Sequence, residues 1–248
     1  QNLDISVGDI VILKLGNYEL IRKIKKDFHI SLTKSLLKNK SNGDKIKLSI
    51  LKISKKENCL NRPKIEVQSD KLDVRHFIPK KTIFNHPIYI IDRNNDYSYV
   101  WYPIGGGAKH IIIKNYISIE KIAELIGFYF GDGSTSKGIR SFRLTNCEPS
   151  VLNYCLDALE EMGIPRNSFK MQIIYSTNKE LTESIKSRCL IFWSKTLKID
   201  KVVSVLKSKN IRETLEYGSV RIFIDNAVLV EIFLHGLLKD ILLRITNP

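Results

Sequence analysis

The segment Leu125–Gly133, which reads LIGFYFGDG, most constrains the fold that this chain can adopt. Ser118 can cap a helix that begins directly after it and continues into this segment. Because apolar residues occupy most positions of the helix, we expect it to be buried on nearly all sides. Gly127 and Gly131 are four residues apart and share one face, and small residues at this spacing allow a second helix to approach closely.

An acidic residue, Asp132, falls at the C-terminal end of this helix, just before Gly133. We expect the glycine to reverse the chain there. A carboxylate is locally unfavourable at a helix C-terminus, where the helix dipole is already negative. A metal ion beside Asp132, a neighbouring lysine or simple exposure to solvent would each relieve this repulsion.

The glycines, the apolar positions and the acid of this segment resemble the motif of the LAGLIDADG homing endonucleases. The resemblance implies that the motif helix packs on its twin at a two-fold or pseudo-two-fold axis. It also implies that Asp132, with the Gly131 carbonyl beside it, binds Mg²⁺ or another divalent cation. The implied activity is hydrolysis of double-stranded DNA at specific sites by a homodimer joined through this helix, with one good acid per chain.

The elements expected after the motif support the same resemblance. We expect a strand ending at Asn146, a helix over 148–162 and a strand over Phe169–Tyr175, and the segment Arg143–Asn146 also resembles the family. This order is similar to one repeat of the α+β LAGLIDADG fold, an αββαββα saddle whose polar sheet face lies in the DNA major groove. Further along, the pattern predicts helices over 179–188 and 200–209, an apolar strand between them at 189–193, and a strand over 219–225.

Basic and amide side chains on this half of the chain are candidate DNA contacts, since arginine and glutamine suit base edges and lysine suits phosphates. The alternative for each is a solvated strand residue. Lys170 or Lys179 could take the basic role that the family places near the metal, and the sequence does not choose between them. The candidates are Lys137, Arg140, Arg143, Lys170, Gln172 and Arg221.

The last apolar stretch, over 226–245, is expected to be helical. Within it, Leu234–Asp240 resembles a degraded second copy of the motif, with Gly236 at the packing glycine and Ile241 where the acid would stand. Two interpretations stay open: a pseudo-symmetric partner for the first helix, or the closing helix of a single repeat.

The formal net charge of the chain is +14, which points to a polyanionic partner, most commonly nucleic acid. Residues 1–117 hold 22 Lys and Arg against 11 Asp and Glu, whereas residues 118–248 hold 18 against 15. We therefore expect a basic, mixed α/β accessory region over 1–112 and a LAGLIDADG-like domain over 113–248. Helical patterns at Tyr18–Phe28 and Ser31–Lys40 could form a helix-turn-helix or a solvated amphipathic pair.

The same composition bounds where the protein acts. No apolar run is long enough to span a membrane, so no membrane partner is expected. The four cysteines lack metal-ligand spacing and are too few for a disulfide framework in a chain of 248 residues, which favours a reduced, cytoplasmic setting. The sequence thus predicts a metal-dependent DNA endonuclease; the alternative is a catalytically inactive descendant that binds DNA or RNA as a regulator or splicing factor.

Overall fold

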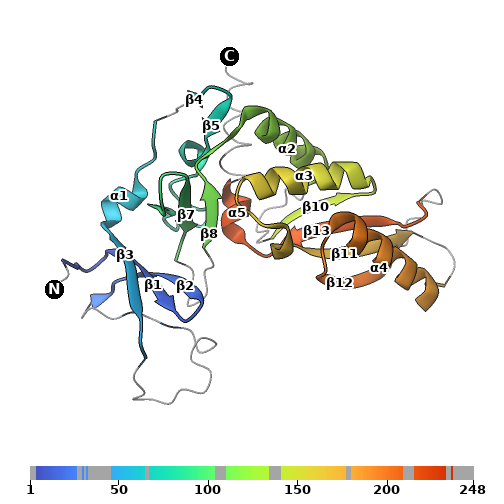
Figure 1. The fold of residues 1–248 in the computed structure, drawn as a ribbon, viewed down its shortest axis with the longest axis horizontal. Helices are drawn as coiled ribbons and strands as arrows, with labels where there is room; N and C mark the ends of the chain where they lie inside the picture. Colours follow the sequence, from blue (N-terminus) through green and yellow to red (C-terminus); the bar gives the residue numbers. More distant parts are fainter. Residues whose placement is uncertain are drawn as a thin grey trace.

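The computed structural model describes residues 4–26, 30, 32, 46–64, 67–103, 110–133, 141–176, 180–208, 215–232 and 236, which form an α+β fold (Figure 1). The α+β class expected from the sequence is therefore confirmed. The elements in chain order are β1 (Ile10–Leu15), β2 (Tyr18–Lys23), β3 (Ser49–Ser54), α1 (Lys56–Leu60), β4 (Val67–Gln68), β5 (Lys71–Asp73), η3 (Val74–Phe77), β6 (Tyr89–Asp92), β7 (Tyr97–Trp101), β8 (Ile111–Lys114), β9 (Tyr116–Ser118), α2 (Ile119–Asp132), β10 (Phe142–Asn146), α3 (Pro149–Glu161), η5 (Arg166–Ser168), β11 (Lys170–Ser176), α4 (Glu183–Leu197), β12 (Val202–Ser208), β13 (Ser219–Ile224) and α5 (Ala227–Val230).

The C-terminal half is a sheet with the strand order β10-β13-β11-β12, and α2, α3 and α4 lie on one side of it (Figure 1). β13 is antiparallel to both of its neighbours, whereas β11 and β12 are parallel and are joined through α4. Alternation along the strands turns residues such as Leu144, Met171 and Ile222 toward the helices, where they are buried. The other face of the sheet carries most of its polar side chains, together with Phe223 and Ile174.

The sheet β6-β7-β8 is buried on both faces, so it joins the two halves of the chain. One set of alternate residues, including Ile90 and Val100, packs in the same core as α2 and α3. The other set, including Tyr89 and Trp101, packs against the N-terminal sheet β2-β1-β3. The boundary expected at residue 112 therefore falls inside strand β8 and does not separate two cores.

This shared core leads to a prediction for a truncated chain that begins at residue 113. Removing Ile90, Val100 and Ile111 exposes the apolar surface they cover, at about 1.5–3 kcal/mol for each side chain. A loss of this size is comparable with the whole stability of a typical domain. We expect the truncated chain to lack a cooperative urea transition monitored by circular dichroism, and a sharp transition would contradict the shared core.

The N-terminal segment expected to be a helix over Tyr18–Phe28 begins instead as strand β2, so that helical prediction, and the helix-turn-helix built on it, are wrong. β1 and β2 form a hairpin in which Leu15 pairs with Tyr18, which leaves a two-residue turn. Gly16, the first residue of that turn, has a φ of 58°, as such turns require. The second helix of the pair, Ser31–Lys40, lies outside the described residues apart from residue 32.

The region 180–208 also differs from expectation. The apolar run at 189–193 lies inside α4, because Cys189, Trp193 and Leu197 are spaced four apart and form the buried face of a helix. The predicted helix at 200–209 is strand β12, whose first residues are the β-branched Val202 and Val203. Consequently one described strand separates α2 from α3, and α4 separates β11 from β12, which departs from the expected order αββαββα.

Candidate functional site

The outer face of α2 carries both motif glycines and is uncovered in the single chain. Gly127 and Gly131 are exposed, and a Cβ built on either would meet no atom of a neighbouring element within 4 Å among the described residues. The side chain of Phe130 on the same side is 60% exposed. The expectation that α2 is buried nearly all round is therefore wrong for one chain. The open surface lacks bulk at the two glycines, and it also carries the exposed carboxylates of Glu120 and Glu124.

The glycine of the closing segment packs elsewhere. Gly236 is buried, and a Cβ there would collide with the carbonyl oxygen of Phe77 and approach Pro79 at 3.3 Å. Those contacts lie in and just after η3, not on α2. The interpretation in which Gly127 and Gly236 face each other within one chain is thereby excluded, and the rest of Leu234–Asp240 lies outside the described residues.

Asp132 ends α2 as an exposed carboxylate held at the edge of the sheet. Its Oδ2 accepts a hydrogen bond from Asn146 Nδ2 at 2.7 Å, and Asn146 Oδ1 in turn accepts the Glu148 backbone N–H at 2.7 Å. One turn earlier on α2, the Tyr129 ring stacks on Phe142 of β10 with centroids 4.5 Å apart. Strand β10 thus positions the end of the helix as well as the carboxylate.

The residue after Asp132 does not reverse the chain as expected. Gly133 has φ −80° and ψ 160°, an extended conformation open to any residue. A side chain is nevertheless excluded there, since its Cβ would lie 2.6 Å from Cδ2 of the Tyr129 ring. The glycine therefore allows close approach to Tyr129 at the helix end.

The end of α2 offers oxygen ligands of the kind that a hard divalent cation prefers, but one chain supplies too few of them for a complete site. Among the described residues, Asp132 Oδ1 has no hydrogen-bond partner, and the Gly131 carbonyl belongs to the last turn, whose carbonyls lack intrahelical donors. Mg²⁺ is commonly bound by one or two carboxylates together with phosphates and water. In the described part of a single chain, no three His, Cys, Asp or Glu side chains gather as a metal site.

The polar face of the C-terminal sheet carries a continuous row of hydrogen-bonded side chains. Arg221 of β13 donates from Nε to Thr145 Oγ1 at 3.3 Å and from Nη1 to Gln172 Oε1 at 3.2 Å. Gln172 Nε2 then donates to Ser204 Oγ at 3.0 Å. These four residues are direct neighbours in the strand register, so the row crosses β10, β13, β11 and β12.

A second row beside it holds two of the predicted cations. Arg143 and Lys170 both pair with Phe223 in the strand register, and Lys170 Nζ lies 5.9 Å from the centroid of the Phe223 ring. Lys170 Nζ also donates to Asp225 Oδ2 at 2.9 Å. The structure thus brings together four of the predicted contacts on one sheet face, namely Arg143, Lys170, Gln172 and Arg221.

The ion pair of Lys170 is exposed and can open. The hydrogen bond from Ser141 has the largest effect in lowering the pKa of Asp225 below its usual value, and the hydrogen bond from Lys170 has the next largest. The two side chains remain 43% and 52% exposed, however, and surface ion pairs contribute little to stability. Lys170 is therefore available to an anion with a higher charge density than Asp225.

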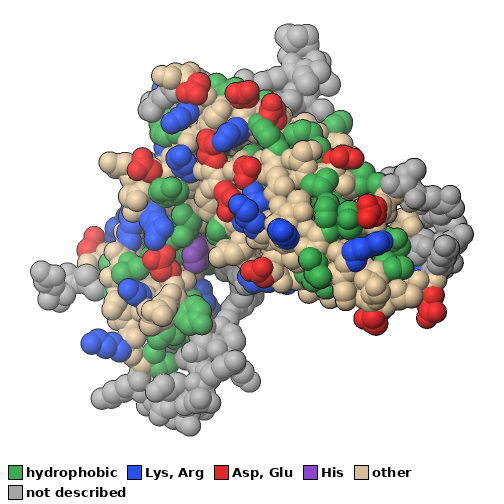
Figure 2. All heavy atoms as spheres, turned by 45° about the vertical axis from the view of Figure 1, so that its right-hand side comes forward, with side chains coloured by type: hydrophobic (Ala, Val, Ile, Leu, Met, Phe, Trp, Pro, Cys, Tyr) green, Lys and Arg blue, Asp and Glu red, His purple; other side chains and the backbone are tan. Residues whose placement is uncertain are grey.

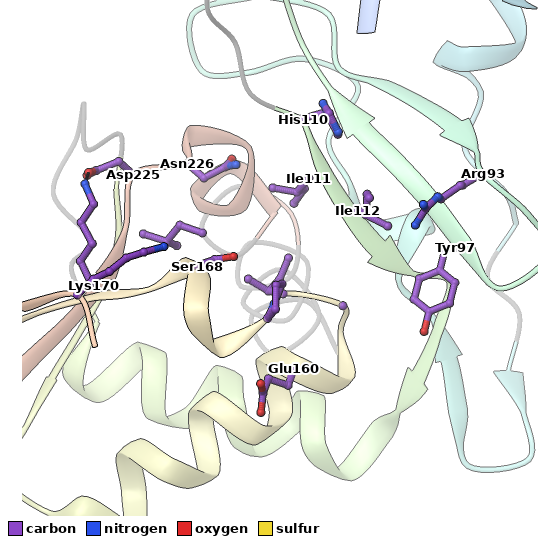
Figure 3. Close-up of a pocket in the computed structure, with 15 residues that line it drawn as sticks. Arg93, Tyr97, His110, Ile111, Ile112, Glu160, Ser168, Lys170, Asp225 and Asn226 are labelled. Carbon is purple, nitrogen blue, oxygen red and sulfur yellow. Dashed lines mark hydrogen bonds and ion pairs between the residues drawn. The ribbon is translucent and has the colours of Figure 1, made fainter. Parts of the chain in front are cut away.

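A groove of about 740 Å³ runs between strand β8 and the point where β11 begins and β13 ends (Figure 3). Lys170 and Asp225 lie at one end, and Arg93 and Tyr97 lie at the other. Burial lowers the pKa of His110, which also lines the groove. Figure 2 shows the molecule hollowed between its N-terminal and C-terminal parts, with Lys and Arg side chains on both sides.

Some residues of the site were not predicted from the sequence, and some predicted residues lie outside the described part of the chain. Asn146, Thr145 and Ser204 complete the hydrogen-bonded site, and strand alternation was the one signal that could have placed them. The candidates Lys137, Arg140 and Lys179 lie outside the described residues.

In the part of the chain that the structure describes, none of the helices has the length and apolar character needed to cross a bilayer. Comparison of the chain with protein-family models, with curated proteins and with solved structures found no match.

Proposed function

We propose that this chain is a site-specific DNA endonuclease of the LAGLIDADG type, which acts as a homodimer with Mg²⁺ or another divalent cation. The observation that carries the proposal is the uncovered glycine face of α2, which ends at the exposed carboxylate of Asp132. Two such faces packed together would bring two Asp132 carboxylates close to one axis. The second carboxylate would supply the ligand that one chain lacks.

The sheet would act as the DNA-binding saddle. Its Arg143, Gln172 and Arg221 side chains offer the donors and acceptors that suit base edges in the major groove. The hydrogen bonds from Arg221 to both neighbouring strands hold its guanidinium in a fixed plane, which favours a directional contact. Lys170 would exchange its ion pair with Asp225 for an ion pair with a DNA phosphate.

At the scissile phosphate, Asp132 and the Gly131 carbonyl would hold the cation, and Asn146 would orient the Asp132 carboxylate. When bound, a divalent cation activates water for attack and stabilises the charge that develops on the phosphate oxygens. The strand register places Lys170 opposite Phe223, three residues along β13 from the Val220 that pairs with Asn146, so Lys170 would hold the DNA backbone away from Asp132. Lys179 would be the alternative basic residue beside the metal.

The test is selection of cleaved duplexes from a randomised pool with Mg²⁺, repeated with EDTA. The proposal expects recovery of a defined sequence only with the metal. The second candidate, a protein that binds DNA or RNA without cutting, is favoured by the single carboxylate that a chain presents at Asp132. It expects enrichment of bound sequences and no cleaved product under either condition.

Replacing Arg221 by alanine should weaken specific binding and relax the preference at one base pair, because a good bidentate base contact is worth roughly 1–3 kcal/mol. The same change leaves Gln172 and Thr145 without their shared donor. Lys201→Ala serves as a comparison, since Lys201 donates to the Asn167 carbonyl away from the row. Competition titrations with single-base variants of the selected duplex measure the effect, and an unchanged preference at every position would remove Arg221 from base recognition.

A further inference from the structure

The loop formed by residues 79–88, between η3 and β6, presents two large apolar side chains to solvent. Ile83 is 46% exposed and Phe84 is 55% exposed, whereas Thr82 beside them is only 5% exposed. An exposed apolar pair at a loop tip costs solvation free energy that the fold does not recover within the single chain. Because the two side chains are neighbours at the loop tip, they form one small apolar surface that a partner could cover.

This loop is held in one conformation by Thr82. The Thr82 backbone N–H donates to the His86 carbonyl at 2.8 Å, and its carbonyl accepts from Asn85 N–H at 2.9 Å. Its Oγ1 accepts the backbone N–H groups of Phe84 at 3.2 Å and His86 at 3.1 Å. Asn85 adopts a left-handed φ of 63°, which asparagine tolerates well. Hydrogen bonds within the loop therefore fix the conformation of its tip.

The two stems of the loop are joined by Arg62. Its Nε donates to the Ile78 carbonyl at 2.7 Å, and its Nη2 donates to the Pro79 and Ile88 carbonyls at 2.8 and 2.9 Å. Burial lowers the pKa of Arg62 to about 10. The buried guanidinium thus fixes both ends of the loop, and little conformational freedom remains for a partner to remove on binding.

The loop carries basic residues and no acidic ones. Lys80 and Lys81 are exposed on the first stem, and His86 is exposed on the second. The sequence from Val74 to Ile91 contains no aspartate or glutamate. An apolar tip with cations at its base matches a partner that has an apolar interior behind an anionic surface.

We propose that the 79–88 loop inserts Ile83 and Phe84 as a wedge into duplex DNA, with Lys80 and Lys81 on the flanking phosphates. Apolar side chains that enter between base steps unstack them and kink the duplex. The choice of DNA rests on the proposed function, because an anionic bilayer has similar chemistry. DNA is favoured because the polar row through Arg221 and Gln172 offers hydrogen bonds suited to base edges, for which a bilayer has no counterpart.

The test measures unwinding of closed-circular DNA, which requires no knowledge of the target sequence. A relaxed plasmid is treated with a metal-independent topoisomerase in EDTA and low salt, in the presence of the full chain. We expect the wild-type protein to shift the linking number and Phe84→Ala to abolish the shift, with an affinity loss of roughly tenfold. Phe84→Trp should retain both, and Ile191→Ala, which removes an apolar side chain that is 66% exposed on α4, should change neither.

The lysines have a separate signature. The double variant Lys80→Gln and Lys81→Gln should reduce the slope of log affinity against log salt by about two, since two phosphate contacts are lost. A Phe84→Ala protein that melts, binds and unwinds plasmid like the wild type would overturn the wedge and leave the proposed DNA binding intact. Wild-type protein that ignores DNA but sediments with phosphatidylserine vesicles in a Phe84-dependent manner would overturn both.

Discussion

The Asp132→Asn variant is expected to lose metal-dependent DNA cleavage by about a thousandfold, because a bound cation supplies several kcal/mol of transition-state stabilisation. Its affinity for the duplex should remain close to that of the wild type. The amide keeps a carbonyl oxygen for Asn146, and position 132 is exposed, so the fold has no reason to change. Single-turnover cleavage and a binding titration in Ca²⁺ measure the two quantities.

The matched control for that variant is Asp200→Asn, which removes one exposed carboxylate that lies before β12. It changes the net charge by the same amount and should cut at the wild-type rate. If Asp132→Asn cut as fast as this control, the acid at the end of α2 would have no part in the chemistry.

The Gly127→Leu variant is expected to give folded, inactive monomers. Among the described residues no atom of a neighbouring element lies within 4 Å of a Cβ at residue 127, so the fold of one chain has room for the leucine Cβ there. Replacing an exposed helical glycine should even add about 0.8 kcal/mol to helix stability. In the dimer the same side chain would push the two α2 helices apart, and the two Asp132 carboxylates could no longer meet.

Sedimentation velocity and a thermal melt together measure these effects. Ser187→Leu is the matched control, since it adds the same side chain at an exposed position of α4. A Gly127→Leu protein that remains dimeric and active would place the subunit contact somewhere other than this face of α2.

The parts of the fold that could be predicted are those with a single strong periodicity. The helices α2 and α3 and the strands β10 and β13 could be placed because their apolar residues recur at helical or strand spacing. The cap expected from Ser118 is absent, since its side chain makes no capping hydrogen bond. The short apolar run containing Cys189 and Trp193 fits either a helix or a strand, and packing on the sheet selected the helix. The parallel pairing of β11 with β12 needs that helix as its crossover, so a prediction without the helix could not give the sheet topology.

Residues of the candidate site could be predicted where the chemistry of a single residue at its position was enough to indicate a role. Asp132 was singled out because a helix C-terminus disfavours an acid, and Arg221 because arginine suits the edges of bases. Cross-strand partners could not be found in this way, since Thr145 and Ser204 are identified only by register. The role of Arg62 was also hidden, because its acceptors are main-chain carbonyls that the sequence does not mark.

The measurement that tests the paired-Asp132 account most directly is the mass of the wild-type protein in solution, alone and with its selected duplex in Ca²⁺. The account predicts two copies of the 28.6 kDa chain on each duplex, with Gly127→Leu reduced to one. Analytical ultracentrifugation with absorbance at two wavelengths gives the protein-to-DNA ratio. A single chain per duplex that nevertheless cleaves both strands would contradict the account.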